Sequence, residues 1–257
     1  ENGAPIQKSL PLLRVFHKLG VRYITLTHNG DNEIADSASQ GQRWHGLSPF
    51  GREVVAEMNR LGMIIDVAHA SDETFYDVLE YSRAPIVSTH SCCRALAHHR
   101  RNMSDEMLRA LADKGGVIQI NFYPVFLSDA FAKTLADSGL ESKSWTEQDW
   151  INDPLNPEKA AAWNAVLDEF AALPRPSYKD VVDHIDHAVK VAGIESVGIG
   201  TDFDGIEVTP AGLENISKIG VIFDEMSSRG YTDDQIEKVA GKNFLRVFND
   251  VTSLTAK

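Results

Sequence analysis

Two histidines, His69 and His90, end two short apolar runs, residues 64–69 (IIDVAH) and 86–90 (IVSTH). Runs rich in β-branched residues are typical of strands buried in a parallel sheet. Between them, Ser71 followed by two acids predicts a helix start, so the order is strand, helix, strand. Because chemistry in such folds gathers at the carboxyl ends of the strands, two imidazoles at the same rim could hold one metal ion. A histidine at a strand end can also be a plain hydrogen-bonding loop residue, and these runs alone leave both roles open.

Two further strand ends carry groups with acid–base capacity. His28 ends the run at residues 22–28 (RYITLTH), and Asp202 lies in residues 200–205 (GTDFDG). Asp202 beside a metal-bound water could accept its proton, although an aspartate turn or a helix cap explains it equally well, and Asp204 suits the turn role better. His28 could be a core histidine, or it could donate a hydrogen bond to a developing oxyanion.

A local basic cluster, residues 98–102 (HHRRN), follows the run that ends at His90. Such clusters are usually solvated surface. On a loop at the active rim, however, Arg101 could bind a carboxylate through two parallel hydrogen bonds. In an acidic protein this patch predicts an anionic group on the substrate. Glu1, in contrast, would be an ordinary terminal residue on residue type alone.

The composition limits the class of protein. The chain has 257 residues, of which 43% are hydrophobic and 24% charged, and its formal net charge is −12. That balance suits a soluble globular protein and argues against nucleic acid or an anionic membrane as a partner. The sequence contains neither a long apolar run nor a signal-like start. The adjacent Cys92 and Cys93 do not fix a redox compartment, so periplasm and cytoplasm both stay open.

Strand-like runs alternate with helical patterns throughout, which predicts a parallel sheet with helical crossovers. Polar residues at many strand ends favour an α/β fold of the (β/α)₈ TIM barrel type over an open sheet. We expect the chain to cover roughly the part from the third strand end to the C-terminal helices, as a single catalytic domain over residues 1–257 with an insertion at about 124–176. The predicted strands are residues 22–28, 64–69, 86–90, 117–122 and 196–205, and the predicted helices include residues 9–19, 49–61, 157–173, 177–192, 213–229 and 232–249.

A series of motifs resembles the renal (membrane) dipeptidase family, which consists of zinc-dependent enzymes with amidohydrolase-type barrels. The motifs match in order and spacing, and the resemblance covers nearly all of the chain outside residues 124–176. They are residues 1–3 (ENG), 23–28 (YITLTH), 66–69 (DVAH), 88–91 (STHS), 100–102 (RRN) and 200–205 (GTDFDG).

The resemblance implies a metal-dependent hydrolase site with two zinc ions. Glu1 would bridge both ions, and His69 and His90 would complete the shell of one. Family members hold the other ion with a His-x-Asp pair on the first strand, and no such pair precedes Glu1 in this sequence. We expect the pair in an upstream segment; the alternative is that the second metal is absent.

The resemblance also implies roles toward a small dipeptide substrate. His28 would polarise the scissile carbonyl, Arg101 would bind the terminal carboxylate, and Asp202 would bind the amino group and shuttle protons. The expected reaction is hydrolysis, by a zinc-bridging hydroxide, of dipeptides with free amino and carboxyl termini. Two alternatives stay open: an N-acyl-amino-acid or lactam amidohydrolase on the same site, and a metal-free or single-metal homologue that binds a ligand without turnover. Membrane association is not indicated, and a homodimer is compatible with the sequence.

Overall fold

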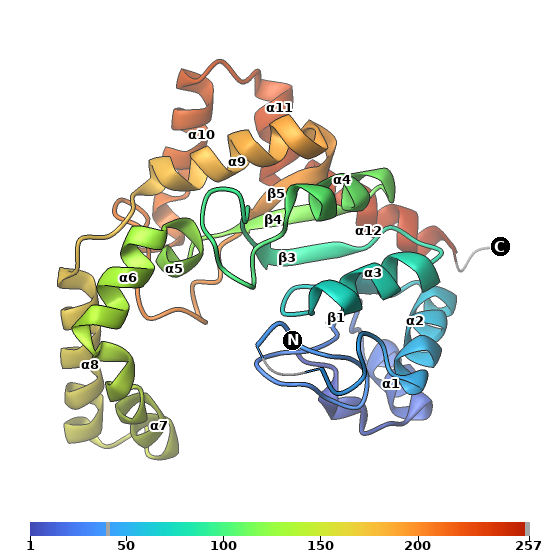
Figure 1. Cartoon of the computed structure of the whole chain (residues 1–257), viewed down its shortest axis with the longest axis horizontal. Helices are drawn as coiled ribbons and strands as arrows, with labels where there is room; N and C mark the ends of the chain where they lie inside the picture. The colour runs from blue at the N-terminus through green and yellow to red at the C-terminus, as the bar shows by residue number, and fades with distance from the viewer. Residues whose placement is uncertain (40–41, 255–257) are drawn as a thin grey trace.

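A single parallel sheet organises the chain (Figure 1). The computed structural model describes residues 1–39 and 42–254. Within them, five strands lie in the order β1-β2-β3-β4-β5, and every neighbouring pair is parallel. This confirms the predicted parallel sheet with helical crossovers. The strands are β1 (Tyr23–Thr25), β2 (Ile64–Asp66), β3 (Val87–Ser91), β4 (Val117–Asn121) and β5 (Val197–Gly200).

Helices on the sheet begin where serine side chains cap them. Ser48, Ser71 and Ser104 each accept a hydrogen bond from the amide three residues further along the chain, which satisfies an otherwise unpaired N–H of the first turn. Ser177 forms a full capping box with Asp180. The helices of this part are η1 (Ala4–Ile6), α1 (Leu10–Lys18), α2 (Pro49–Leu61), α3 (Asp72–Tyr81), α4 (Asp105–Asp113), α9 (Tyr178–Ala192) and η3 (Ile194–Ser196).

The segment expected as an insertion is more helical than its sequence predicted. Only the helix at 157–173 was expected, whereas the structure has α5 (Pro124–Leu127), α6 (Asp129–Ser138), η2 (Leu140–Lys143), α7 (Trp145–Asn152) and α8 (Pro157–Ala172). Helices α6 to α8 form an arm at the lower left of Figure 1, away from α1 to α3. The arm has its own apolar cluster, which Val208 joins from the loop after β5.

The C-terminal helices differ from the prediction. The helix expected at 213–229 begins only with η4 (Ile216–Lys218) and α10 (Gly220–Ser228). The helix expected at 232–249 is three pieces, α11 (Asp233–Glu237), the π-helical turn η5 (Lys238–Lys242) and α12 (Asn243–Ser253), because the backbone of Gly241 leaves the helical conformation. An apolar periodicity does not register such a break.

Helix α12 covers the amino ends of three strands. Its Val247 and Val251 form a buried cluster with Ile64, Val87 and Val117, which are the first residues of β2, β3 and β4. The opposite, carboxyl ends of the strands are therefore where polar side chains can gather. Within the described ranges, no helix has the length and apolarity needed to cross a membrane.

Candidate metal and substrate site

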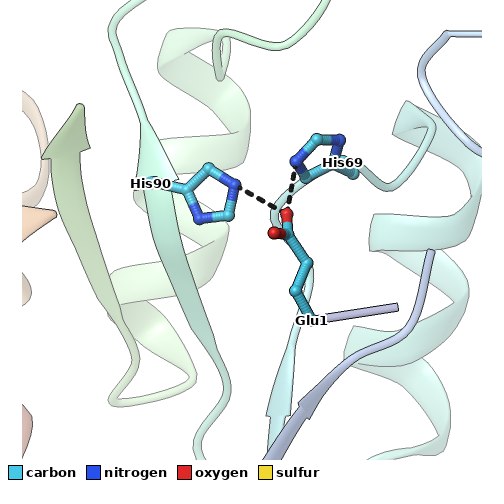
Figure 2. A group of neighbouring side chains, drawn as sticks. All are labelled: Glu1, His69 and His90. Carbon is cyan, nitrogen blue, oxygen red and sulfur yellow. Dashed lines mark ion pairs between the residues drawn. The ribbon is translucent and has the colours of Figure 1, made fainter. Parts of the chain in front are cut away.

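Three side chains converge at the carboxyl ends of β2 and β3 (Figure 2). Glu1 Oε1 lies 2.7 Å from His69 Nε2 and 3.2 Å from His90 Nε2. The three ligand atoms all lie within 4.8 Å of one another. His69 and His90 are largely buried, whereas the carboxylate of Glu1 is 43% exposed. The site is therefore enclosed on its histidine side and open to solvent on its glutamate side.

A close backbone contact places Glu1 at this rim. Gly3 donates its N–H to the carbonyl of Leu26, 3.2 Å away, just beyond β1. A Cβ at Gly3 would lie 2.4 Å from the side chain of Ile34 and 2.9 Å from Leu26 O, so no larger residue fits there. The Asn2 side chain accepts hydrogen bonds from Ala4 and from Asn32. The first residues are thus held against the sheet, and Glu1 points to the histidines.

His69 was expected at the end of a strand, but it lies three residues beyond β2. Its backbone is left-handed, with φ of 67°. Arg101 Nη1 lies 2.7 Å from His69 Nδ1. Because arginine only donates, Nδ1 accepts here, and the imidazole proton sits on Nε2, facing Glu1. Burial lowers the pKa of His69 to about 4, so the ring is neutral near pH 7.

His90, inside β3, has the opposite arrangement. Its Nδ1 lies 2.9 Å from the hydroxyl oxygen of Thr89, which gives its own proton to Asp66. The Thr89 oxygen therefore accepts from His90 Nδ1, and the lone pair of Nε2 faces the carboxylate of Glu1. A cation placed between these two lone pairs removes their repulsion. Two imidazole nitrogens and a carboxylate oxygen are also the ligands that zinc prefers, so the residues fit a zinc ion.

The carboxylate of Glu1 is strongly stabilised in its charged form. The hydrogen bond that Glu1 accepts from His69 holds the pKa of Glu1 far below its usual range, against the opposing effect of burial. Glu1 is therefore a full negative charge at any physiological pH, as a metal ligand must be.

Arg101 contacts the ring of His69 and the backbone carbonyl of His90. It is 8% exposed, its Nη2 is 3.4 Å from the carbonyl of His90, and its guanidinium carbon is 5.3 Å from the ring centre of Phe126. Its Nε–H finds no hydrogen-bond partner among the described residues. Burial lowers the pKa of Arg101 to about 10, opposed by the charges of Asp202 and Glu1. The side chain thus stays cationic and has donor capacity left for an anion.

His28 and Asp202 flank this group from other elements. His28 lies beyond β1, with Nε2 3.8 Å from Glu1 Oε1 and its ring centre 4.5 Å from that of His69. Asp202 lies two residues beyond β5 in a left-handed conformation, φ 59°, and its Oδ2 accepts a 2.9 Å hydrogen bond from Asn121 Nδ2. The structure therefore brings Glu1, His28 and His69 together. Among the described residues Asp202 makes no hydrogen bond or ion pair with them, and only its negative charge acts on Arg101, whose pKa it raises.

Sequence reasoning missed three supporting residues. Asp66 and Thr89 lie within the motifs themselves, and Asn121 ends β4. The signal that could have found Asp66 is an acidic residue inside an otherwise apolar strand, because carboxylates are rarely fully buried without a specific set of partners.

The fold and the site together define an α/β barrel-type protein with a candidate metal centre at its strand ends. The family model for membrane dipeptidases (peptidase family M19) matches residues 1–257, and the chain belongs to this family. Among curated relatives, it is 39% identical over 247 residues to the "Uncharacterized dipeptidase C965.12" of Schizosaccharomyces pombe, covering 95% of this chain and 50% of the relative. It is 36% identical over 249 residues to the dipeptidase tcpJ of Claviceps purpurea, covering 96% and 49%.

Solved structures show the same fold. The probable dipeptidase PvdM of Pseudomonas aeruginosa matches with a TM-score of 0.82 and 33% identity, over 98% of this chain and 68% of that one. A metallo peptidase of Rhodobacter sphaeroides, liganded with a phosphinate mimic of the dipeptide L-Ala-D-Ala, matches with a TM-score of 0.74 and 23% identity, over 95% and 60%. The chain spans about half the length of the curated relatives it matches. These matches confirm the family resemblance and the barrel-type fold class.

Proposed function

We propose that the protein is a metal-dependent dipeptidase that hydrolyses dipeptides with a free amino and a free carboxyl terminus. The observation that carries this proposal is the convergence of Glu1, His69 and His90 beside a buried Arg101, in a chain of the membrane dipeptidase family. A metal-ligand set next to a buried cation suits a substrate whose scissile carbonyl lies close to a carboxylate.

The proposed cofactor is zinc. Glu1, His69 and His90 would hold one ion, and we expect a second ion to share Glu1. Bound zinc would supply a Lewis acid and lower the pKa of a water molecule.

The chain's own residues would then handle the substrate. Arg101 would hold its terminal carboxylate, and Asp202 would bind the amino group. His28 would donate a hydrogen bond to the carbonyl oxygen as negative charge develops there. Asp202, kept in place by Asn121, would take the proton of the attacking water and pass it to the leaving nitrogen.

The role of Arg101 gives a direct test with three substrates. Arg101→Met should raise KM for a free dipeptide about 10-fold to 100-fold, because a charge-assisted hydrogen bond to a buried group contributes roughly 1.5–3 kcal/mol. The same variant should change KM little for the C-terminally amidated dipeptide, which lacks the carboxylate. An equal loss on both substrates would contradict the assignment.

The third substrate is the N-acetylated dipeptide. The parent protein should hydrolyse it poorly, because acetylation removes the amino group that Asp202 would bind. Hydrolysis as fast as that of the free dipeptide would instead favour an N-acyl-amino-acid amidohydrolase on the same site.

A further inference from the structure

Asp66, the last residue of β2, is a fully buried carboxylate with four hydrogen bonds. Its Oδ2 accepts from the hydroxyls of Thr25 and Thr89, at 2.5 and 2.6 Å. Its Oδ1 accepts from the backbone N–H groups of Ala68 and Thr89, both at 3.0 Å. All four donors are uncharged. Burying a carboxylate costs several kcal/mol, which these donors offset only in part, so an apolar residue would serve a purely structural role better.

Beyond the last paired residues of β2 and β3, the segments that carry His69 and His90 separate. There a hydrogen bond to the Asp66 carboxylate takes the place of a backbone bond between the strands. β2 and β3 pair in register only through Asp66 and Val87. The last backbone bond between them runs from Val67 N to Val87 O, at 2.8 Å. Beyond it, the N–H of Thr89 reaches the Asp66 side chain rather than a backbone carbonyl. The Asp66 carboxylate thus links the segment that carries His69 to the segment that carries His90.

The chain of hydrogen bonds has a fixed direction. Thr89 has a single hydroxyl proton, and it donates that proton to Asp66. Its oxygen is then free only to accept, and the group that reaches it is His90 Nδ1, at 2.9 Å. The proton of the neutral imidazole is therefore held on Nδ1, and Nε2 keeps its lone pair directed at the Glu1 carboxylate (Figure 2).

We propose that Asp66, acting through the hydroxyl of Thr89, is a positioning residue that sets the tautomer and the orientation of His90 for metal binding. The inference rests on the proposed function, since it takes His90 to be a metal ligand. Asp66 touches neither substrate nor metal in this account.

The two threonines bonded to the same Asp66 oxygen provide a matched pair of variants. Thr89→Val removes the hydroxyl that contacts His90, whereas Thr25→Val removes a hydroxyl that donates to the same Asp66 oxygen and has no hydrogen bond to His90. Thr89→Ser keeps the hydroxyl. The probe is zinc alone, titrated into the metal-free protein expressed from its complete gene, with a competing chelator. Thr89→Val should weaken zinc binding about 10-fold to 100-fold, as removal of a partner behind a metal ligand commonly does.

In the same titration, Thr25→Val and Thr89→Ser should stay within about 3-fold of the parent protein, because both leave the Thr89 hydroxyl in place. Equal zinc affinities for Thr89→Val and Thr25→Val would overturn the proposal. Both valine variants lose one hydroxyl that donates to Asp66, so their unfolding temperatures serve as the stability control.

A second readout needs neither metal nor activity. Nitrogen-15 NMR of the imidazoles, in metal-free protein at a pH where they are neutral, reports which nitrogen of His90 carries the proton. The parent protein should show the proton on Nδ1, and Thr89→Val should show a mixture. A proton on Nε2 of His90 in the parent protein would overturn the inference, and this result does not depend on whether Thr89→Val folds. Absence of dipeptide hydrolysis with the expected tautomer would instead count against the proposed function alone.

Discussion

The two imidazoles that meet Glu1 carry their protons on different nitrogens. His90 has its proton on Nδ1, toward Thr89, and its Nε2 is ready to bind a cation. His69 has its proton on Nε2, because Arg101 donates to its Nδ1. A cation bound at His69 Nε2 requires the proton on Nδ1, where it would face the guanidinium. Arg101 and a metal ion therefore make opposite demands on the same ring.

This opposition yields a prediction about zinc affinity. Arg101→Met removes both the competing donor and a positive charge close to the ligands, so zinc should bind several-fold more tightly than to the parent protein. The measurement is a chelator competition titration. A second variant, Arg100→Met, removes a neighbouring positive charge that makes no contact with His69 and serves as the control. Weaker zinc binding in Arg101→Met than in Arg100→Met would contradict the assigned tautomer.

Among the helices and strands, features set by neighbouring residues were predicted better than features set by contacts between residues far apart in the sequence. The helix start at Ser71 follows from a capping side chain and the two acids next to it, and the structure has it. The end of the predicted strand at 64–69 did not follow, because the side chain of Asp66 takes over a hydrogen bond that a backbone ladder with β3 would make. The predicted strands at 22–28 and 196–205 are also shorter in the structure.

The site residues also divide into those that local sequence indicates and those that it does not. His69 and His90 could be proposed from their repeated placement after apolar runs. Glu1 could be proposed only from the resemblance, because its position depends on the contact between Gly3 and Leu26, which no local pattern encodes. The helices α6 and α7 were missed because their apolar residues pack on the arm's own small cluster rather than on the sheet.

Helices α1 and α2 are joined by a charge network that predicts a pH dependence of stability. Glu57 on α2 is buried, with Oε1 2.7 Å from Arg60 Nη2 and 2.5 Å from Arg14 Nε on α1. Hydrogen bonds from Arg60 first, and then from Arg14, lower the pKa of Glu57 to about 2 against the effect of burial. Since the folded-state pKa lies below that of the unfolded chain, this stabilisation is present above about pH 4.3 and is lost as the pH falls toward 2.

Glu57→Gln should therefore lower the free energy of unfolding by about 1 kcal/mol at pH 7, a value reduced by the solvent exposure of both arginines. The difference from the parent protein should shrink steadily as the pH falls from about 4 toward 2. Urea unfolding at several pH values measures it. Glu53→Gln, an exposed position on the same helix, should leave stability nearly unchanged. A Glu57→Gln effect that stays constant down to pH 2 would exclude the charge network as its cause.

On the scale of the molecule, the two ends of the sheet have separate tasks. Helix α12 covers the amino ends of β2, β3 and β4 with an apolar cluster, beside which Arg246 donates a hydrogen bond to the carbonyl of Gly115. The carboxyl ends present Glu1, His69 and His90, and the loop after β5 carries both Asp202 and Val208, which joins the arm of α6 to α8. Stability and chemistry are thus placed at opposite ends, as in barrel enzymes generally.

The most direct test of the account is zinc-dependent hydrolysis of a free dipeptide by the protein expressed from its complete gene. The activity should disappear when the metal is stripped with a chelator and return when zinc is added. His90→Ala, assayed at the same zinc concentration, should remain at least about 100-fold below the parent protein, because one ligand of the proposed ion is gone. Undiminished hydrolysis in the stripped protein, or full recovery of His90→Ala, would contradict the central claim that Glu1, His69 and His90 hold the catalytic metal.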